Sequence, residues 1–185
     1  MNLKSLFVSF VLLGPLLLLS FLGWTLPRPL SLEQGQFVSP TLGFQISAGQ
    51  SGWRLEAPPE SLPSIVTIFK SPQPQTGLPA TATVRVDHLE SPLTLAQYVR
   101  RWMQDYHRFG FDILQNQPIR VEGQEAFLLD LLHREEERQL RQIVFVKEKT
   151  AVILTCRDQQ SNFNQSLPAC NEIARQFRWL SSSAQ

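Results

Sequence analysis

One continuous apolar run stands apart from the rest of the chain. Residues 6–26 read LFVSFVLLGPLLLLSFLGWTL, and no charged residue lies between Lys4 and Arg28. As a helix rising about 1.5 Å per residue, this run spans roughly 31 Å, which matches the hydrocarbon thickness of a bilayer. Trp24 stands near the outer end of the run, where indole rings prefer the membrane interface. Residues 6–26 therefore predict one transmembrane helix.

A cleaved signal peptide is the alternative interpretation of this run. Cleavage needs a shorter apolar core followed by small residues, and Gly23-Trp24-Thr25 is the one candidate site near its end. The pattern favours an uncleaved single-pass anchor, while cleavage stays open. Lys4 favours a cytoplasmic N-terminus for residues 1–5, which places the main domain in the periplasm or a lumen.

The run is followed by a tether and one folded domain. Residues 27–36 (PRPLSLEQGQ) are rich in proline and polar residues, as linkers are. Ten residues reach at most about 35 Å, so the domain stays near the membrane surface. We expect the domain to cover residues 37–180 and residues 181–185 to form a disordered tail.

The first half of the domain changes from a strand pattern to a helix pattern. Strands are predicted over 37–38, 42–47, 53–56, 64–70 and 81–89, and the segment 72–79 is predicted as a loop. A capping box of Thr94 and Gln97 then opens a helix that Gly110 ends. Its predicted inward stripe consists of Leu95, Val99, Trp102, Tyr106 and Phe109.

The second half of the domain predicts an antiparallel meander and a second helix. Strands are expected over 112–117, 125–134, 139–147 and 151–156, joined by turns too short for parallel crossovers. The second helix carries an apolar stripe that contains Pro168, so it either begins near this proline or bends there. Its members are Phe163, Leu167, Cys170, Ile173, Ala174 and Phe177. The predicted fold class is α+β, an antiparallel sheet flanked by helices.

The order of these segments resembles a known group of domains. The quoted stretches are FVSPTLGFQIS, TLAQYVRRWMQDYHRFGFDIL, RVEGQEAFLLDL, RQIVFVKEKTAVILTC and NFNQSLPACNEIARQFRWL. Together they resemble the PsbP-like and DcrB-like extracytoplasmic domains over about residues 37–180. The resemblance implies an α/β/α sandwich and an accessory role at photosynthetic membranes or bacterial envelopes. Many bacterial members are lipoproteins, whereas this chain has no cysteine after its apolar run.

Composition and charge exclude two classes of partner. The chain is 43% hydrophobic with a net charge of +1, and Lys4 is the one charged residue of the first 26. The remaining body is therefore neutral. A neutral body argues against nucleic-acid binding and against a polybasic membrane-surface module.

No catalytic signature is present in the sequence. It contains no glycine-rich phosphate loop, HExxH, CxxC or G-x-S-x-G motif. His88 and Glu90 offer two metal ligands on one strand, which is too few for a site, and residues 135–137 (EEE) suit a solvated turn. We therefore predict no catalytic, cofactor-binding or metal-binding residue, no cofactor and no enzyme activity.

Docking residues are expected on the first helix and at two tryptophans. Arg100, Arg101 and Arg108 fall on the solvent side of the helix, where they would meet an acidic partner. Trp53 and Trp179 would be docking anchors if their rings are partly exposed.

Cys156 and Cys170 are the two cysteines. They either form a disulfide between the last strand and the last helix, as an oxidising compartment favours, or are two buried small apolar residues.

Three functions remain open on the sequence. The favoured one is a non-enzymatic, membrane-anchored accessory domain that docks on a membrane protein complex and aids its assembly or stability. The second is a small-molecule or lipid-binding envelope module, which would need a largely apolar concave pocket. The third is an enzyme whose active site carries no recognisable motif.

Overall fold

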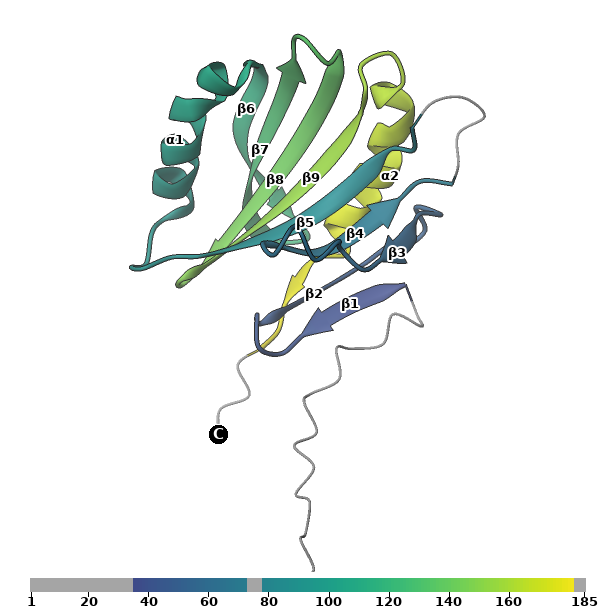
Figure 1. Cartoon of the computed structure of the whole chain (residues 1–185). Coiled ribbons are helices and arrows are strands. Elements are labelled where there is room, and N and C mark those ends of the chain that lie inside the picture. Colours follow the sequence, from purple (N-terminus) through teal and green to yellow (C-terminus); the bar gives the residue numbers. More distant parts are fainter. Residues whose placement is uncertain (1–34, 73–77, 182–185) are drawn as a thin grey trace, which may run out of the picture.

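The computed structural model describes residues 35–72 and 78–181 (Figure 1). The predicted anchor over 6–26, the linker as far as residue 34 and the tail from residue 182 lie outside the described residues. None of the helices in the described ranges is both long enough and apolar enough to cross a membrane.

A seven-stranded antiparallel sheet forms the centre of the domain. Its last four strands follow one another as a meander, and their hairpins are closed by tight turns. The turn between β6 and β7 consists of Glu122 and Gly123, both with positive φ, as a two-residue hairpin requires. In spatial order the strands are β3 (Arg54–Glu56), β4 (Ile65–Lys70), β5 (Thr81–His88), β9 (Thr150–Gln159), β8 (Arg138–Lys147), β7 (Gln124–His133) and β6 (Phe111–Val121).

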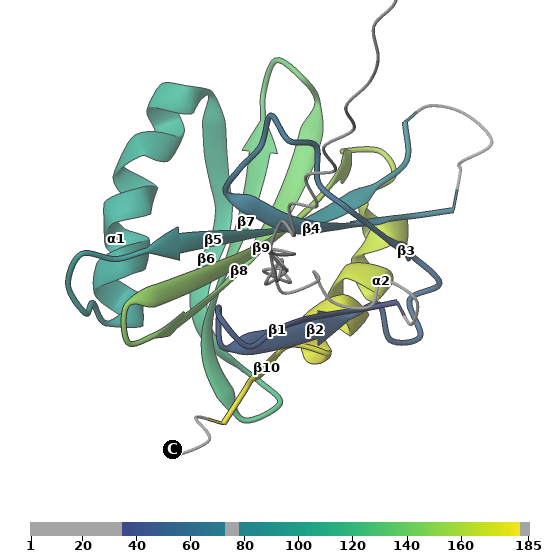
Figure 2. The same cartoon turned by 60° about the horizontal axis from the view of Figure 1, so that its bottom comes forward.

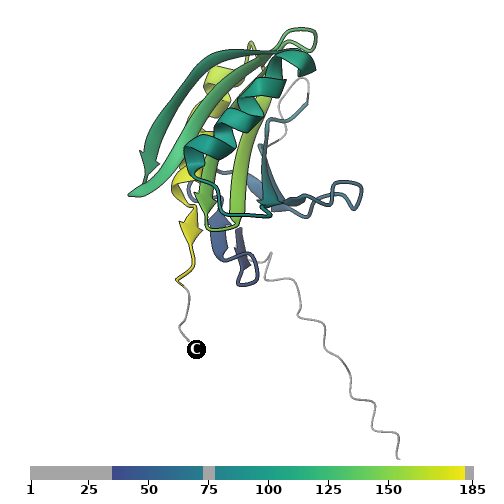
Figure 3. The same cartoon turned by 90° about the vertical axis from the view of Figure 1, so that its left-hand side faces the viewer.

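The two helices cover opposite faces of this sheet (Figure 3). Side chains alternate along a strand, so β9 serves both layers. Ala151 and Ile153 pack in the cluster under α1 (Leu95–Tyr106), whereas Val152 and Leu154 pack in the cluster under α2 (Phe163–Arg175). The predicted α+β fold, an antiparallel sheet flanked by helices, is confirmed.

A small second sheet lies beside the α2 layer (Figure 2). It consists of β1 (Gln36–Ser39), β2 (Phe44–Ser47) and β10 (Arg178–Trp179). The predicted opening hairpin is present, while β10 was not predicted, because two residues carry no periodicity. Aromatic packing joins this sheet to the core: Phe177, which precedes β10, stacks on Phe145 of β8 with ring centres 4.0 Å apart.

The first helix begins as predicted and ends differently. The backbone N–H of Gln97 donates to Thr94 Oγ1 (3.3 Å), and Gln97 Oε1 accepts from the N–H of Thr94 (2.9 Å), so the capping box is present. The chain then tightens into a 3₁₀ turn over His107–Phe109. Phe109 was predicted to face inward, and this is wrong: it is 62% exposed, because three residues per turn rotate it off the helical stripe. Tyr98, outside the predicted stripe, is buried instead.

Two strands extend well beyond their predicted bounds, and the second helix does not begin at its proline. β6 continues to Val121 and β9 to Gln159, beyond the predicted 117 and 156, because pairing with a neighbouring strand extends them through polar positions. α2 begins at Phe163, so Pro168 lies inside it and is exposed.

Candidate docking surface

Exposed basic and apolar side chains lie along α1, in the 3₁₀ turn that follows it and on the edge strand β6. We call this the α1–β6 surface and define it by Arg100, Arg101, Arg108, Phe109 and Leu114. The three arginines are exposed, Phe109 is 62% exposed and Leu114 is 52% exposed. The other large exposed hydrophobics of the described ranges, Leu62 and Leu78, lie in loops at the opposite side of the sheet.

The charge of this surface is positive. Arg108 Nη1 lies 3.5 Å from Asp105 Oδ1 and is partly neutralised. Within the described ranges, Arg100 and Arg101 have no ion-pair partner, and no acidic residue lies in the first turn of α1. The guanidinium groups of Arg100 and Arg101, which we call the basic row, therefore remain available to external carboxylates.

A groove of about 610 Å³ lies between the start of α1 and the β6–β7 hairpin. Its walls are the first turn of α1, including Leu95 and Ala96, and the β6–β7 hairpin, including Pro118 and Phe127. Ala96 stands one helical turn before Arg100, so the groove and Arg100 share one side of α1, while Arg101 lies on the neighbouring side. The rim carries Arg120 and Glu125, whose charged atoms lie 3.7 Å apart.

The free edge of β6 is a poor template for an added strand. Counting from the Val121–Gln124 pair that closes the hairpin, the backbone groups of Asn116, Pro118 and Arg120 point away from β7. Pro118 has no N–H to donate there, and the register shifts between Ile113 and Gln115. Edge strands use both devices to prevent unwanted pairing. Docking at this edge therefore depends on side chains.

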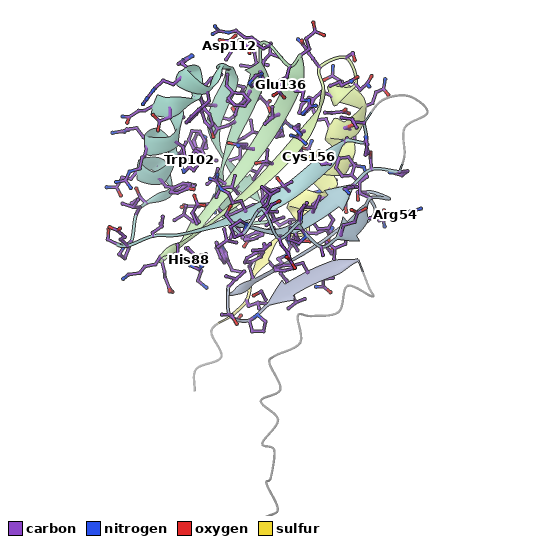
Figure 4. The ribbon with its side chains drawn as sticks, in the orientation of Figure 1. Arg54, His88, Trp102, Asp112, Glu136 and Cys156 are labelled. Atoms are coloured by element: carbon purple, nitrogen blue, oxygen red, sulfur yellow. A yellow bond between two sulfur atoms is a disulfide. The ribbon has the colours of Figure 1, made fainter. Side chains whose placement is uncertain are left out.

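One end of α1 is held on the sheet by a partly buried polar cluster. Tyr98 Oη donates to Asp87 Oδ2 at 2.5 Å, and Arg85 Nη2 donates to the same oxygen at 3.1 Å. The guanidinium carbon of Arg85 lies 4.1 Å from the ring centre of Trp102, which is on the sheet side of α1 (Figure 4). Burial and then the Asp87 carboxylate raise the pKa of Tyr98 well above its ordinary value.

The other end of α1 is held by a second polar contact. Tyr106 Oη donates to Gln142 Oε1, and Gln142 Nε2 donates in turn to Thr155 Oγ1 at 3.3 Å. Burial raises the pKa of Tyr106 to about 12. Both tyrosines are protonated at neutral pH, and each hydroxyl donates a hydrogen bond that holds α1 on the sheet.

His88, His133 and the three glutamates at 135–137 do not converge on a reaction centre. His88 and residues 135–137 are exposed, and His133 accepts a hydrogen bond from the backbone N–H of Glu136. Across 35–72 and 78–181, no three His, Cys, Asp or Glu side chains gather in a way that would hold a metal ion.

The predicted docking residues do not form one surface. The three arginines lie together on α1, but Trp53 is only 7% exposed within the α2-side core. The prediction that Trp53 contacts a partner is therefore corrected, because its ring is covered by the domain itself. Trp179 is half-buried in β10, where it lines a different groove and packs edge-on against Phe177.

The two cysteines are bonded in the structure. Cys156 of β9 and Cys170 of α2 form a disulfide, and their Cα atoms lie 6.0 Å apart. Both are buried, so the bond ties the last helix to the middle of the sheet from within the core.

Sequence reasoning missed the apolar part of the α1–β6 surface. Phe109 fits the helical spacing of the inward stripe. The one sequence signal against an inward position was Gly110, which indicates that the helix ends there. For Leu114, the polar run Gln115–Gln117 was a signal of an uncovered edge. The groove joins α1 to β6–β7, and periodicity does not report contacts between distant segments.

Comparisons with known proteins identify the fold. No protein-family model and no curated protein matches the sequence. Among solved structures, cyanobacterial PsbP from Synechocystis has a TM-score of 0.55 at 12% identity, covering 78% of this chain and 91% of its own. LpqN from Mycobacterium tuberculosis, described as involved in cell envelope biogenesis, has a TM-score of 0.59 at 15% identity, covering 75% and 83%.

A third structure, a protein of unknown function from Pseudomonas aeruginosa, has a TM-score of 0.53 at 21% identity, covering 64% of this chain and 83% of its own. At these identities the comparisons establish the fold alone. The predicted resemblance to PsbP-like and DcrB-like domains is confirmed at that level.

Proposed function

We propose that this chain is a membrane-anchored extracytoplasmic accessory protein that docks on a membrane protein complex and aids its assembly or stability. The observation that carries the proposal is the α1–β6 surface. Arg100 and Arg101 have no acidic partner among the described residues, and they stand on α1 between an apolar groove at its first turn and the exposed Phe109 after its last turn. The partner would present carboxylates flanked by apolar side chains.

The composition of the surface suits a protein partner. Arginine and aromatic residues are enriched at protein interfaces, and they supply most of the binding energy at hot spots. The polar clusters around Tyr98 and Tyr106 hold α1 on the sheet, so little ordering of the helix would be needed on binding. A preorganised surface binds with a smaller entropic cost.

The anchor would make weak docking sufficient. In this proposal residues 6–26 span the bilayer, residues 1–5 are cytoplasmic and the domain is periplasmic or lumenal. A short tether raises the effective concentration of a domain near its partner to the millimolar range for flexible linkers. The fold supports this placement through LpqN, which is described as acting in cell envelope biogenesis.

The same proposal assigns no enzyme activity to the domain. The tyrosines of the α1 clusters have raised pKa values, and His88 stands exposed at a strand end. Tyr98 Oη does lie beside a base, the Asp87 carboxylate, but its raised pKa disfavours the phenolate form that a tyrosine nucleophile needs.

Crosslinking in intact membranes tests the docking. A photoreactive amino acid at Ala96, which lines the groove, should capture one defined membrane protein. The double variant Arg100→Glu/Arg101→Glu should lose this adduct, because it reverses the charge of the basic row.

The matched control is Arg54→Glu in β3, an exposed arginine at the opposite edge of the sheet (Figure 4). It makes the same chemical change away from the surface and should keep the adduct. The proposal is refuted if Ala96 captures nothing in membranes that contain the folded chain, or if both variants lose the adduct equally.

A further inference from the structure

An open groove of about 730 Å³ is lined in part by the last residues that the structure describes. We call it the terminal groove. Its walls are the β1–β2 turn, with Pro40 and Leu42, the β8–β9 turn, with Lys147 and Thr150, and Trp179 with the residues that follow it. It is separate from the groove of the α1–β6 surface, with which it shares no lining residue.

Trp179 and Lys147 form the fixed centre of this groove. The ring of Trp179 packs edge-on against Phe177 at 5.1 Å and against Phe44 at 6.3 Å, so the core holds its orientation. Lys147 Nζ lies 5.9 Å from the centre of the same ring. The Trp179 indole therefore has one side against the apolar core and one side toward solvent, with an ammonium group nearby. Tryptophan and lysine in this arrangement are favoured at membrane interfaces.

The charges around the terminal groove are mixed in sign. Lys147 and Lys149 flank Glu148 in the β8–β9 turn, and His88 pairs with Thr150 from the neighbouring strand. A site with both cationic and anionic groups suits a ligand that carries both a phosphate and an amine, and it does not suit a polyanion.

The tether joins the domain at the start of β1, and the terminal groove lies one short strand away, at the turn that follows β1. The described chain begins at Gly35, and β1 runs from there to Ser39, directly before Pro40 of the groove. Thirty-four residues precede Gly35, and they include the predicted membrane span at 6–26. Between that span and β1, about ten residues reach at most roughly 35 Å.

We propose that the terminal groove binds phospholipid headgroups of the bilayer that holds the anchor. Lys147 contacts the phosphate and Trp179 lies at the interface beside it. This inference rests on the anchored arrangement of the proposed function. α1 runs away from this end of the domain (Figure 1). A headgroup bound in the terminal groove would therefore orient the domain so that α1 and its basic row point away from the membrane.

Fluorescence quenching in vesicles tests the groove. The full chain carrying Trp24→Phe is reconstituted in phosphatidylcholine–phosphatidylethanolamine vesicles that contain a lipid with a nitroxide on its headgroup. The emission of Trp179 is the difference between this protein and its Trp24→Phe/Trp179→Phe counterpart. Most of that emission should be quenched, while the buried Trp53 and the distant Trp102 keep theirs.

Substitution at the groove separates contact from mere proximity. Lys147→Gln should relieve the quenching of Trp179, whereas Arg54→Gln at the far edge of the sheet should leave it unchanged. Flotation of the same vesicles reports whether the chain is anchored. If the chain does not float with the vesicles, the membrane anchor is refuted, and so is the binding of phospholipid headgroups in the terminal groove. A chain that floats with Trp179 unquenched, or with quenching insensitive to Lys147→Gln, refutes the groove alone.

Discussion

The disulfide between Cys156 and Cys170 gives the sharpest test of how this domain is stabilised. The two residues are 14 apart in sequence and join β9 to α2. In the chain-entropy model, closing a loop of this length removes about 3 kcal/mol of conformational entropy from the unfolded state. Reduction should therefore lower the free energy of unfolding by about 3 kcal/mol, although no atom of the folded core is removed.

Urea unfolding of the full chain in mild detergent measures this change. The domain is monitored by tryptophan fluorescence with and without a phosphine reductant, and each sample is equilibrated from the unfolded side because the buried sulfurs are protected when folded. With a urea dependence of about 2 kcal/mol per molar, the midpoint should fall by roughly 1.5 M. The double variant Cys156→Ala/Cys170→Ala should unfold at one midpoint in both conditions.

Two results would refute the reasoning. An unchanged midpoint on reduction would mean that the bond does not constrain the unfolded chain. Free thiols found by alkylation of denatured protein from cells, without prior reduction, would mean that the bond does not form where the protein resides. The second result would also oppose an oxidising compartment for the domain.

Three further changes test other parts of the structure. In the native domain the largely buried Arg141 lies 2.6 Å from Asp130 Oδ2. Asp130→Ala leaves this arginine without its carboxylate and should lower the free energy of unfolding, measured in urea, by about 3–5 kcal/mol. Asp130→Leu/Arg141→Met should lower it much less, and equal losses would contradict the ion-pair argument. The pKa of Tyr106 is raised from 10.0 to about 12, so the unfolded chain loses this proton first and stability falls as the pH rises from 10 toward 12. Tyr106→Phe should reduce that alkaline loss by up to about 3 kcal/mol, and an unchanged slope would contradict the burial of its hydroxyl. Phe109→Ser should change stability by less than about 0.5 kcal/mol while weakening the crosslinked adduct, whereas a large loss of stability would mean that Phe109 packs in the core.

Local pattern was sufficient for the elements whose signals lie within a few residues. Thr94 and Gln97 satisfy each other's backbone groups across one helical turn, so the start of α1 follows from four consecutive residues. The short turns of the meander required antiparallel neighbours wherever the strands pack. The α+β fold and its PsbP-like arrangement followed from the order of such elements.

Contacts between distant segments had to be seen in three dimensions. Trp53 and Trp179 are the same residue type, but the fold buries one and leaves the other at a groove. Phe109 has the spacing of an α-helical stripe, but the backbone there forms a 3₁₀ turn. Cys156 lies next to Cys170 only because α2 packs across β9. Burial and proximity depend on how separate elements pack against one another, and a repeat of two or of 3.6 residues reports only which side of one element a residue occupies.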